Sequence, residues 1–231
     1  MYSGNDMLYL IRRPDATSDF LRSMSNSKNE RYRRAIANHR NTPDDVLIKL
    51  SKDKSLQVRK RIVVRQRLPI EALRNLSKDR SETIRKYVAE HGDSDEGVLR
   101  HLSKSKLPYI IRCVVNNSNV SMDVVERFID DPVMSQYIAI KHNLPREFYV
   151  RLSSSPHSYV RERIACNLAV PPNILENMAL IEDSPWVKKM LINNKNVTFE
   201  TLRILMNDND IYVRQNATRT ARSRPDRWEE I

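Results

Sequence analysis

A unit of about 26 residues recurs along this chain, and it limits the possible folds more than any other feature of the sequence. After Pro43, apolar residues stand at offsets three, four and seven, and the same landmarks return 26 positions later, after Pro69. This spacing places side chains on one face of a short helix. A second apolar set, with members four and five residues after its first, follows in each unit and predicts a second helix, as in Val58, Ile62 and Val63.

The repeat extends in both directions and covers residues 17–220 with eight units. The units begin at Thr17, Pro43, Pro69, Asp95, Ser121, Pro145, Pro171 and Thr198. These residue types cap a helix or occupy its first turn. Neither short helix can bury its apolar face alone, so the units must stack around a continuous core. We therefore predict an all-α solenoid of eight two-helix repeats, with residues 1–16 as an N-terminal cap or tail and residues 221–231 as a C-terminal tail.

One unit departs from the period. The stretch from Ser121 to Leu144 has 24 residues, and Pro132 stands where the loop between its helices belongs. Because proline cannot continue a helix, we expect this unit to have a shortened loop between its two helices.

The consensus of the units is Pro-x-x-Val-Leu-x-x-Leu-Ser-x-Asp, followed by Val-Arg-x-x-Val-Ala-x-Asn-x-x-x-Pro, and residues 160–171 match its second half most fully. This pattern resembles the leucine-rich repeat variant, a bacterial two-helix repeat related in style to HEAT repeats. The resemblance covers about residues 17–220 and implies an α-solenoid, but such solenoids host many functions. Iron–sulfur members of that family carry a cysteine cluster ahead of the repeats. Residues 1–16 contain no cysteine, so the resemblance implies no cluster, and we expect no cofactor.

An arginine follows the first apolar residue of most second helices. It is present as Arg33, Arg59, Arg85, Arg161 and Arg214, is replaced by Lys188 in one unit, and is missing where Ile111 and Ser135 stand. An aspartate lies six residues earlier in three units, which gives the pairs Asp53–Arg59, Asp79–Arg85 and Asp208–Arg214. The likeness to HEAT-type repeats implies that such pairs tie the loops together, because a half-buried arginine requires an acidic partner. A ladder of arginines that binds a ligand is the alternative.

The charge of the chain is divided unequally between its halves. The net charge is +11, and residues 1–120 hold 25 lysines and arginines against 14 aspartates and glutamates, whereas residues 121–231 hold 15 of each. All of the excess positive charge therefore lies in the first half, which predicts a one-sided basic patch. Solubility alone is the competing explanation.

Two rows of cations are candidates for the binding surface. We call the recurring arginine of the second helices the ladder arginine. In related solenoids the second helices line the concave face, and the residue after the ladder arginine is then expected to point outward. In the first four units this position holds cations, and two further arginines widen the row: Arg34, Lys60, Lys86 and Arg112, with Arg61 and Arg65. A secondary basic rim is expected in the loops between helices, at Lys52, Lys54, Lys78, Arg80, Lys104 and Lys106.

Such rows suit the phosphate backbone of DNA or RNA, which they would hold through salt-dependent contacts that do not read sequence. A scaffold that docks an acidic protein is the main alternative. A further alternative is an enzyme, a HEAT-like alkylpurine DNA glycosylase, in which Trp186 and the nearby Asp183 would be the candidate residues. We expect Trp186 instead to pack between units, and we assign no catalytic residue.

Other classes of function lack their sequence signals. The five histidines form no metal-binding spacing, and His39 and His91 occupy one repeat position, where polar caps of helix ends are expected. With only three glycines and two cysteines, the chain offers no phosphate-binding glycine loop and no disulfide framework. No apolar run approaches the roughly 18 residues of a membrane span, and the first 15 residues do not resemble a secretion signal. We expect a cytoplasmic protein without metal or membrane partners.

Overall fold

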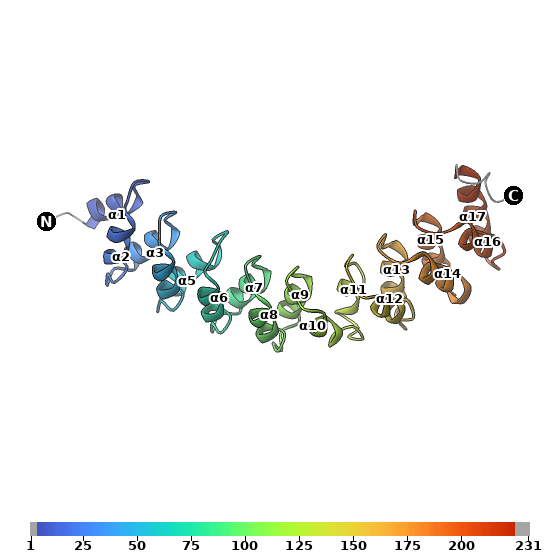
Figure 1. The fold of residues 1–231 in the computed structure, drawn as a ribbon, viewed down its shortest axis with the longest axis horizontal. Helices are drawn as coiled ribbons and strands as arrows, with labels where there is room; N and C mark the ends of the chain where they lie inside the picture. The colour runs from blue at the N-terminus through green and yellow to red at the C-terminus, as the bar shows by residue number, and fades with distance from the viewer. Residues whose placement is uncertain (1–3, 225–231) are drawn as a thin grey trace. The chain divides into compact units, whose positions relative to one another are not determined.

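The computed structural model describes residues 4–224, which divide into two units between Ser121 and Met122. Within the described range all regular secondary structure is helical, and the helices alternate along the chain as the two members of each repeat (Figure 1). The protein is therefore an all-α solenoid, with eight two-helix repeats from α2 to α17. No helix in this range combines the length and the apolar character needed to cross a membrane.

Residues 1–121 form two rows of helices. The first helices of the repeats are α2 (Ser18–Met24), α4 (Asp44–Leu50), α6 (Ile70–Leu76) and α8 (Glu96–Leu102). The second helices are α3 (Glu30–Asn38), α5 (Leu56–Val63), α7 (Glu82–Glu90) and α9 (Pro108–Asn116). Each second helix packs on the next one in its row, and α1 (Gly4–Arg12) packs on α3 at the start of this row. The predicted cap thus includes a helix that covers the first repeat and buries Ile11.

Residues 122–231 repeat this plan. The first helices are α10 (Met122–Glu126), α12 (Arg146–Ser153), α14 (Pro172–Ile181) and α16 (Phe199–Met206). The second helices are α11 (Ser135–Ile138), α13 (Ser158–Cys166), α15 (Pro185–Asn193) and α17 (Ile211–Ser223). In this unit too, helices of one row pack on their neighbours, for example α13 on α15 and α12 on α14.

The predicted unit starts coincide with the caps of the first helices. Thr17, Asp95 and Thr198 each precede a helix and accept a hydrogen bond from its first turn, the shortest being from Val98 N–H to Asp95 at 2.8 Å. Prolines 43, 69, 145 and 171 stand at the same place without a side-chain bond. The predicted apolar sets form the core, and in the third repeat they have no exposed surface: Ala72, Leu73, Leu76, Ile84, Val88 and Ala89.

The 24-residue repeat differs from its prediction. Its helices α10 and α11 have only five and four residues, and residues 127–134 form the turns between them. The shortening therefore falls on the helices and not on the loop. Pro132 stops helix formation, and the carboxylate of Asp131 accepts hydrogen bonds from the N–H groups of Val133 and Met134 at 2.9 and 2.8 Å.

The C-terminal boundary also differs. Helix α17 continues to Ser223 and buries Ala221, so residues 221–223 belong to the last repeat and not to a tail. The rest of the predicted tail, residues 225–231, and residues 1–3 of the predicted cap lie outside the described range.

Candidate anion-binding surface

The loops between the two helices of each repeat place one small polar residue at a fixed point. In the second and third repeats this residue is Asp53 or Asp79, whose carboxylate accepts a hydrogen bond at 2.8 Å from the N–H group two residues later. In the fourth repeat Ser105 does the same with its hydroxyl, at 3.1 Å from Leu107 N. The bond begins the second helix, so the loop keeps its form whether the residue is Asp or Ser.

The ladder arginines pair with the carboxylate of the following repeat. In residues 1–121, Arg33 Nε lies 2.6 Å from Asp53 Oδ2, and Arg59 Nε lies 2.5 Å from Asp79 Oδ2. Each Nη2 donates to the other oxygen of the same carboxylate, at 3.1 and 3.0 Å. These are bidentate ion pairs that join neighbouring repeats. The four carboxylate and guanidinium groups are 5–17% exposed, so the pairs are largely removed from solvent.

The same arrangement recurs in residues 122–231. Arg161 Nε lies 2.7 Å from Glu182 Oε2, and Lys188 Nζ lies 2.5 Å from Asp208 Oδ2. Glu182 lies one residue later in the chain than the 26-residue period would place it, because α14 is longer than the other first helices. A lysine in place of the arginine keeps the charge but loses the two-pronged geometry.

The prediction that each arginine pairs with the side chain of the aspartate six residues earlier, in its own repeat, is therefore wrong. The aspartate six residues before each arginine contributes its main-chain carbonyl instead. Arg59, Arg85 and Arg214 each donate through Nη1 to this carbonyl, at 2.8, 2.6 and 2.7 Å. Each arginine thus holds its own loop through the main chain and, where a carboxylate is available, the next loop through the side chain.

The paired carboxylates stay ionised. Burial by itself raises the pKa of Asp53, Asp79 and Glu182, but the hydrogen bonds from the arginine and from a main-chain N–H group more than offset it, so each pKa lies below its ordinary value. The carboxylate and the arginine neutralise each other inside the structure. The acidic residues of these loops therefore contribute little negative charge to the surface.

The cations of the same loops lie on the outside. All six members of the predicted rim are exposed, and none has a carboxylate within 4 Å among the residues that the structure describes: Lys52, Lys54, Lys78, Arg80, Lys104 and Lys106. We call this set the loop edge. Two cations flank each loop centre, at residues 53, 79 and 105. The loop edge therefore carries uncompensated positive charge over three successive repeats.

The predicted row on the second helices is less uniform. Arg61 and Arg112 are exposed, whereas Arg34, Lys60 and Lys86 are partly buried. Lys86 Nζ lies 3.4 Å from Glu90 Oε1, and the same carboxylate oxygen accepts a hydrogen bond from Cys113 Sγ. Burial and the neighbouring Glu90 raise the pKa of Cys113 to about 11. Negative charge at Glu90 thus interrupts the row between the third and fourth repeats.

Arg65 has a linking role that the sequence analysis did not anticipate. Its Nη1 donates to the carbonyls of Ala37 and His39, both at 3.0 Å, in the preceding repeat. Asn117 makes the same two bonds two repeats later, to Ala89 and His91 at 2.9 and 3.0 Å. The recurrence of polar residues every 26 positions, immediately after the second helix, was the signal for this second ladder.

The two histidines belong to this second ladder as well. His39 and His91 end α3 and α7, as expected for polar caps. Each ring places Nε2 2.8 Å from a main-chain oxygen 26 residues earlier, and its Nδ1 accepts a bond from an N–H group two residues later. Among the residues described, no group of three or more His, Cys, Asp or Glu is arranged to hold a metal ion.

Residues 122–231 expose a different kind of surface. Trp186 and Tyr212 are 55% and 73% exposed, and both line a hollow of about 190 Å³ between α15 and α17. The ammonium of Lys189 lies 5.0 Å from the centre of the Trp186 ring. Asp183 lines another hollow, beside Arg161. Trp186 and Asp183, the two candidate residues of the glycosylase alternative, therefore line two separate hollows.

Comparisons with known proteins support the architecture. No protein-family model and no curated protein sequence matches the chain. A solved structure described as a leucine-rich repeat variant with a novel repetitive protein structural motif aligns over 95% of this chain and 87% of its own, with 21% identity and a TM-score of 0.65. The chain thus has the fold of that repeat protein. A designed armadillo repeat protein in complex with the peptide (KR)4 covers 93% of this chain and 96% of its own, but at a TM-score of 0.25 and 15% identity it supports no argument.

Proposed function

We propose that this protein is a binding solenoid that holds the phosphate backbone of a nucleic acid along the loop edge of residues 1–121. The observation that carries the proposal is that the six cations of the loop edge are exposed and lack carboxylate partners among the described residues, while Asp53 and Asp79 of the same loops are buried in ion pairs. The separation of the two signs of charge leaves a positive edge on an ordered scaffold.

The spacing of the cations favours a linear partner. Helices that pack side by side lie about 8–10 Å apart, so the pairs of loop cations recur at about that interval along the stack. A chain of phosphates can contact several such pairs at once, and each neutralised phosphate releases counterions and adds to the affinity. Contacts of this kind position a nucleic acid without reading its bases. We therefore expect strong dependence on salt and weak dependence on sequence.

A second candidate function is protein docking, and one observation favours it. Trp186 and Tyr212 are exposed in residues 122–231, whose charges balance. Tryptophan and tyrosine are enriched at the centres of protein interfaces. A scaffold could use this unit for a protein partner, whether or not the first unit binds nucleic acid.

Binding of labelled duplex DNA, single-stranded DNA and RNA by the full chain tests the proposal. In fluorescence anisotropy at about 50 mM salt, where electrostatic affinity is large, we expect saturable binding that weakens steeply by about 200 mM. A triple variant, Lys52→Glu, Lys54→Glu and Lys78→Glu, should lose most of this affinity. The matched control reverses three exposed cations of the other unit, Arg163→Glu, Lys195→Glu and Arg219→Glu, and should change it little.

Two outcomes would contradict the proposal. One is the absence of binding to all three nucleic acids at low salt. The other is an equal loss of affinity in the two triple variants, because net charge and not the loop edge would then account for binding. In the first case a pull-down that compares wild type with Trp186→Ala would test the protein-docking function.

A further inference from the structure

The ladder of ion pairs breaks at one internal position. Arg85 donates through Nη1 to the carbonyls of Asp79 and Arg80, at 2.6 and 3.2 Å, as Arg59 does to its own loop. In Arg59, Nε and Nη2 hold the carboxylate of Asp79. The same two nitrogens of Arg85 have no acceptor among the described residues, because the following repeat places Ser105 where the carboxylate would be.

The missing carboxylate is specific to this place in the chain. Ser155 also replaces the aspartate, but there the preceding repeat has Ser135 at the ladder position, so arginine and carboxylate are absent together. Arg214 belongs to the last repeat, and its carboxylate would have to come from a further one. Arg85 is different, because the next repeat is present and packs on it, with α7 against α9. Half of the pair remains, on a side chain held in position by its own loop.

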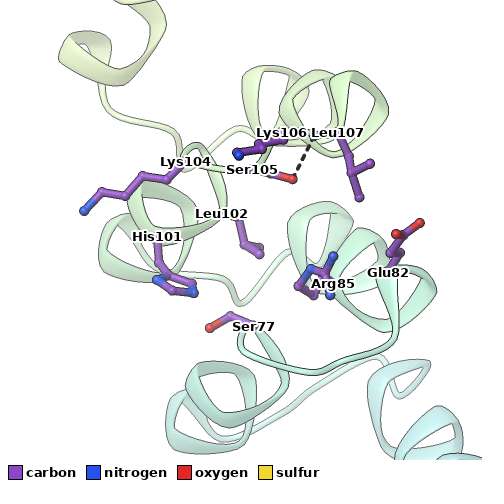
Figure 2. A pocket seen from close by; sticks show the side chains of 9 residues that line it. All are labelled: Ser77, Glu82, Arg85, His101, Leu102, Lys104, Ser105, Lys106 and Leu107. Atoms are coloured by element: carbon purple, nitrogen blue, oxygen red, sulfur yellow. Dashed lines mark hydrogen bonds between the residues drawn. The ribbon is translucent and has the colours of Figure 1, made fainter.

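A hollow of about 410 Å³ has Arg85 among its lining residues. Figure 2 shows Arg85 near the middle of the lining residues, with Ser77 on one side and the loop of Ser105 and Lys106 on the other. His101 and Lys104 come from α8 and the loop that follows it. Glu82 also lines the hollow, but its carboxylate accepts a hydrogen bond from Tyr109 Oη at 2.6 Å.

The charges around the hollow favour an anion. Arg85, Lys104 and Lys106 are positive, and Glu82 is the one carboxylate among the lining residues. Burial, followed by the positive charges of Lys78 and Lys104, lowers the pKa of His101, which therefore lies in a positive environment. In the preceding repeat, Asp79 cancels the charge of Arg59. Here nothing in the loop takes that role.

We propose that this hollow is a binding site for a phosphate group, with Nε and Nη2 of Arg85 as the two-pronged donor and Lys104 and Lys106 as neutralising cations. The ladder pairs of this chain show that an anionic group fits between an arginine and the next loop. A guanidinium fork binds the two charged oxygens of a phosphodiester as it binds those of a carboxylate, and each of these oxygens has further lone pairs for the two lysines. Because two cations of the loop edge line the hollow, the phosphate is a diester of a nucleic-acid backbone, an assignment that rests on the proposed function.

The test uses a variant in which a carboxylate of the chain itself occupies the proposed phosphate position. Ser105→Asp returns the carboxylate to its ladder position and is expected to pair with Arg85, as Asp79 pairs with Arg59. The control Ser105→Asn keeps the turn and adds a side chain of similar size without charge. Each protein is titrated with inorganic phosphate and with dimethyl phosphate at constant ionic strength, and binding is followed by the melting temperature and by the NMR signals of His101.

We expect both phosphates to raise the melting temperature of wild type and of Ser105→Asn in a saturable manner. Ser105→Asp should melt at a higher temperature without ligand and should lose at least tenfold in phosphate affinity. An equal response of wild type and Ser105→Asp would overturn the site. Acetate is the third ligand, and tighter binding of acetate than of either phosphate would overturn the assignment to phosphate in favour of an acidic side chain of a protein partner.

Duplex DNA separates this inference from the proposed function. If the site holds a backbone phosphate, Ser105→Asp should weaken DNA binding about tenfold, while Ser105→Asn should not. If wild type binds phosphate but no nucleic acid, the proposed function fails, and with it the assignment to a backbone diester, while the anion site remains. If DNA binds and Ser105→Asp leaves its affinity unchanged, the proposed function stands and this inference fails.

Discussion

The two units of this protein use one repeat to build two different surfaces. Residues 1–121 carry the whole excess of positive charge, whereas the charges of residues 122–231 balance. The difference reaches the second ladder, which bonds to main-chain carbonyls earlier in the chain. Its members are His39, Arg65, His91 and Asn117 in the first unit, and Asn167 and Asn194 in the second.

This comparison separates the residues that make the fold from those that specialise it. Apolar pairs such as Ile84 with Val88 and Ile164 with Ala165 are fully buried in both units, and both have bidentate pairs between an arginine and a carboxylate. These features recur because each repeat must cover the next one. The loop cations and the unpaired Arg85 occur in one unit only. Departures from the repeat are therefore the places to look for function.

The largest effect is expected from breaking the ladder, which the units share. Asp79→Asn in one unit and Glu182→Gln in the other should each lower the free energy of unfolding by about 3 kcal/mol, because each leaves a half-buried arginine without its counter-charge. Urea denaturation followed by circular dichroism measures this. The control Ser105→Asn should change little, since Ser105 has no ion pair to lose. A large loss in only one unit would show that the ladder does not stabilise both alike.

The next effect concerns binding and should appear in the first unit alone. Reversal of Lys52, Lys54 and Lys78 should weaken duplex DNA binding by about 30-fold, or about 2 kcal/mol. It should also lower the slope of log affinity against log salt by about 2–3, because each lost phosphate contact removes about 0.9 from that slope. An unchanged slope in a titration over salt would show that the loop edge makes no phosphate contacts.

A smaller effect is expected from pH, and it should appear in both units. The pKa values of Asp53, Asp79 and Glu182 are lowered in the folded protein. The charged carboxylates therefore contribute stability that is fully present above about pH 4, the ordinary value, and is lost as the pH falls through their lower folded-state pKa values. Melting temperatures between about pH 6 and pH 3 should show this loss. The fall should be shallower in Asp79→Asn, and a parallel fall would argue against the pair as its source.

The smallest effect should follow from exchanging one member of the second ladder for another. His91→Asn places at position 91 the residue that both units use elsewhere in this ladder, at positions 117, 167 and 194, and we expect a change in unfolding free energy below about 0.5 kcal/mol. His91→Ala removes both ring bonds and should cost about 2 kcal/mol. Thermal melting of the two variants tests this difference. A large loss in His91→Asn would show that the ring is needed for its packing and not for its two bonds.

Much of the fold could be predicted from the sequence, because the same pattern of helix caps and apolar residues recurs in eight units. The starts of the first helices, the apolar sets and the polar caps all follow from spacing. The direction of the ladder could not be predicted in this way. Asp79 lies six residues before Arg85 and twenty after Arg59, and in a repeat of 26 both separations recur together. Only the path of the side chain, toward the next repeat, distinguishes them.

The candidate site shows the same limit. The loop cations and Ser105 can both be read from the sequence. That Ser105 leaves an arginine without a carboxylate becomes clear only once the ladder position facing it is known to be Arg85 of the preceding repeat, and not Ile111 of its own repeat. The role of Arg65 could not be predicted from its neighbours in the sequence, because a cation close to other cations also fits a basic row. Its two carbonyl partners lie in the preceding repeat, 26 and 28 residues away, and composition gives no sign of them.

The forward direction of the ladder also sets an order in time. Each arginine precedes its carboxylate by about 20 residues, so at synthesis rates of about 5–20 residues per second the counter-charge follows by roughly 1–4 s. A nascent repeat therefore leaves the ribosome with its arginine exposed, and the ion pair forms only when the next repeat has been synthesised. For Arg85 the successor arrives without the carboxylate, and this cation keeps in the finished protein the state that its counterparts pass through during synthesis.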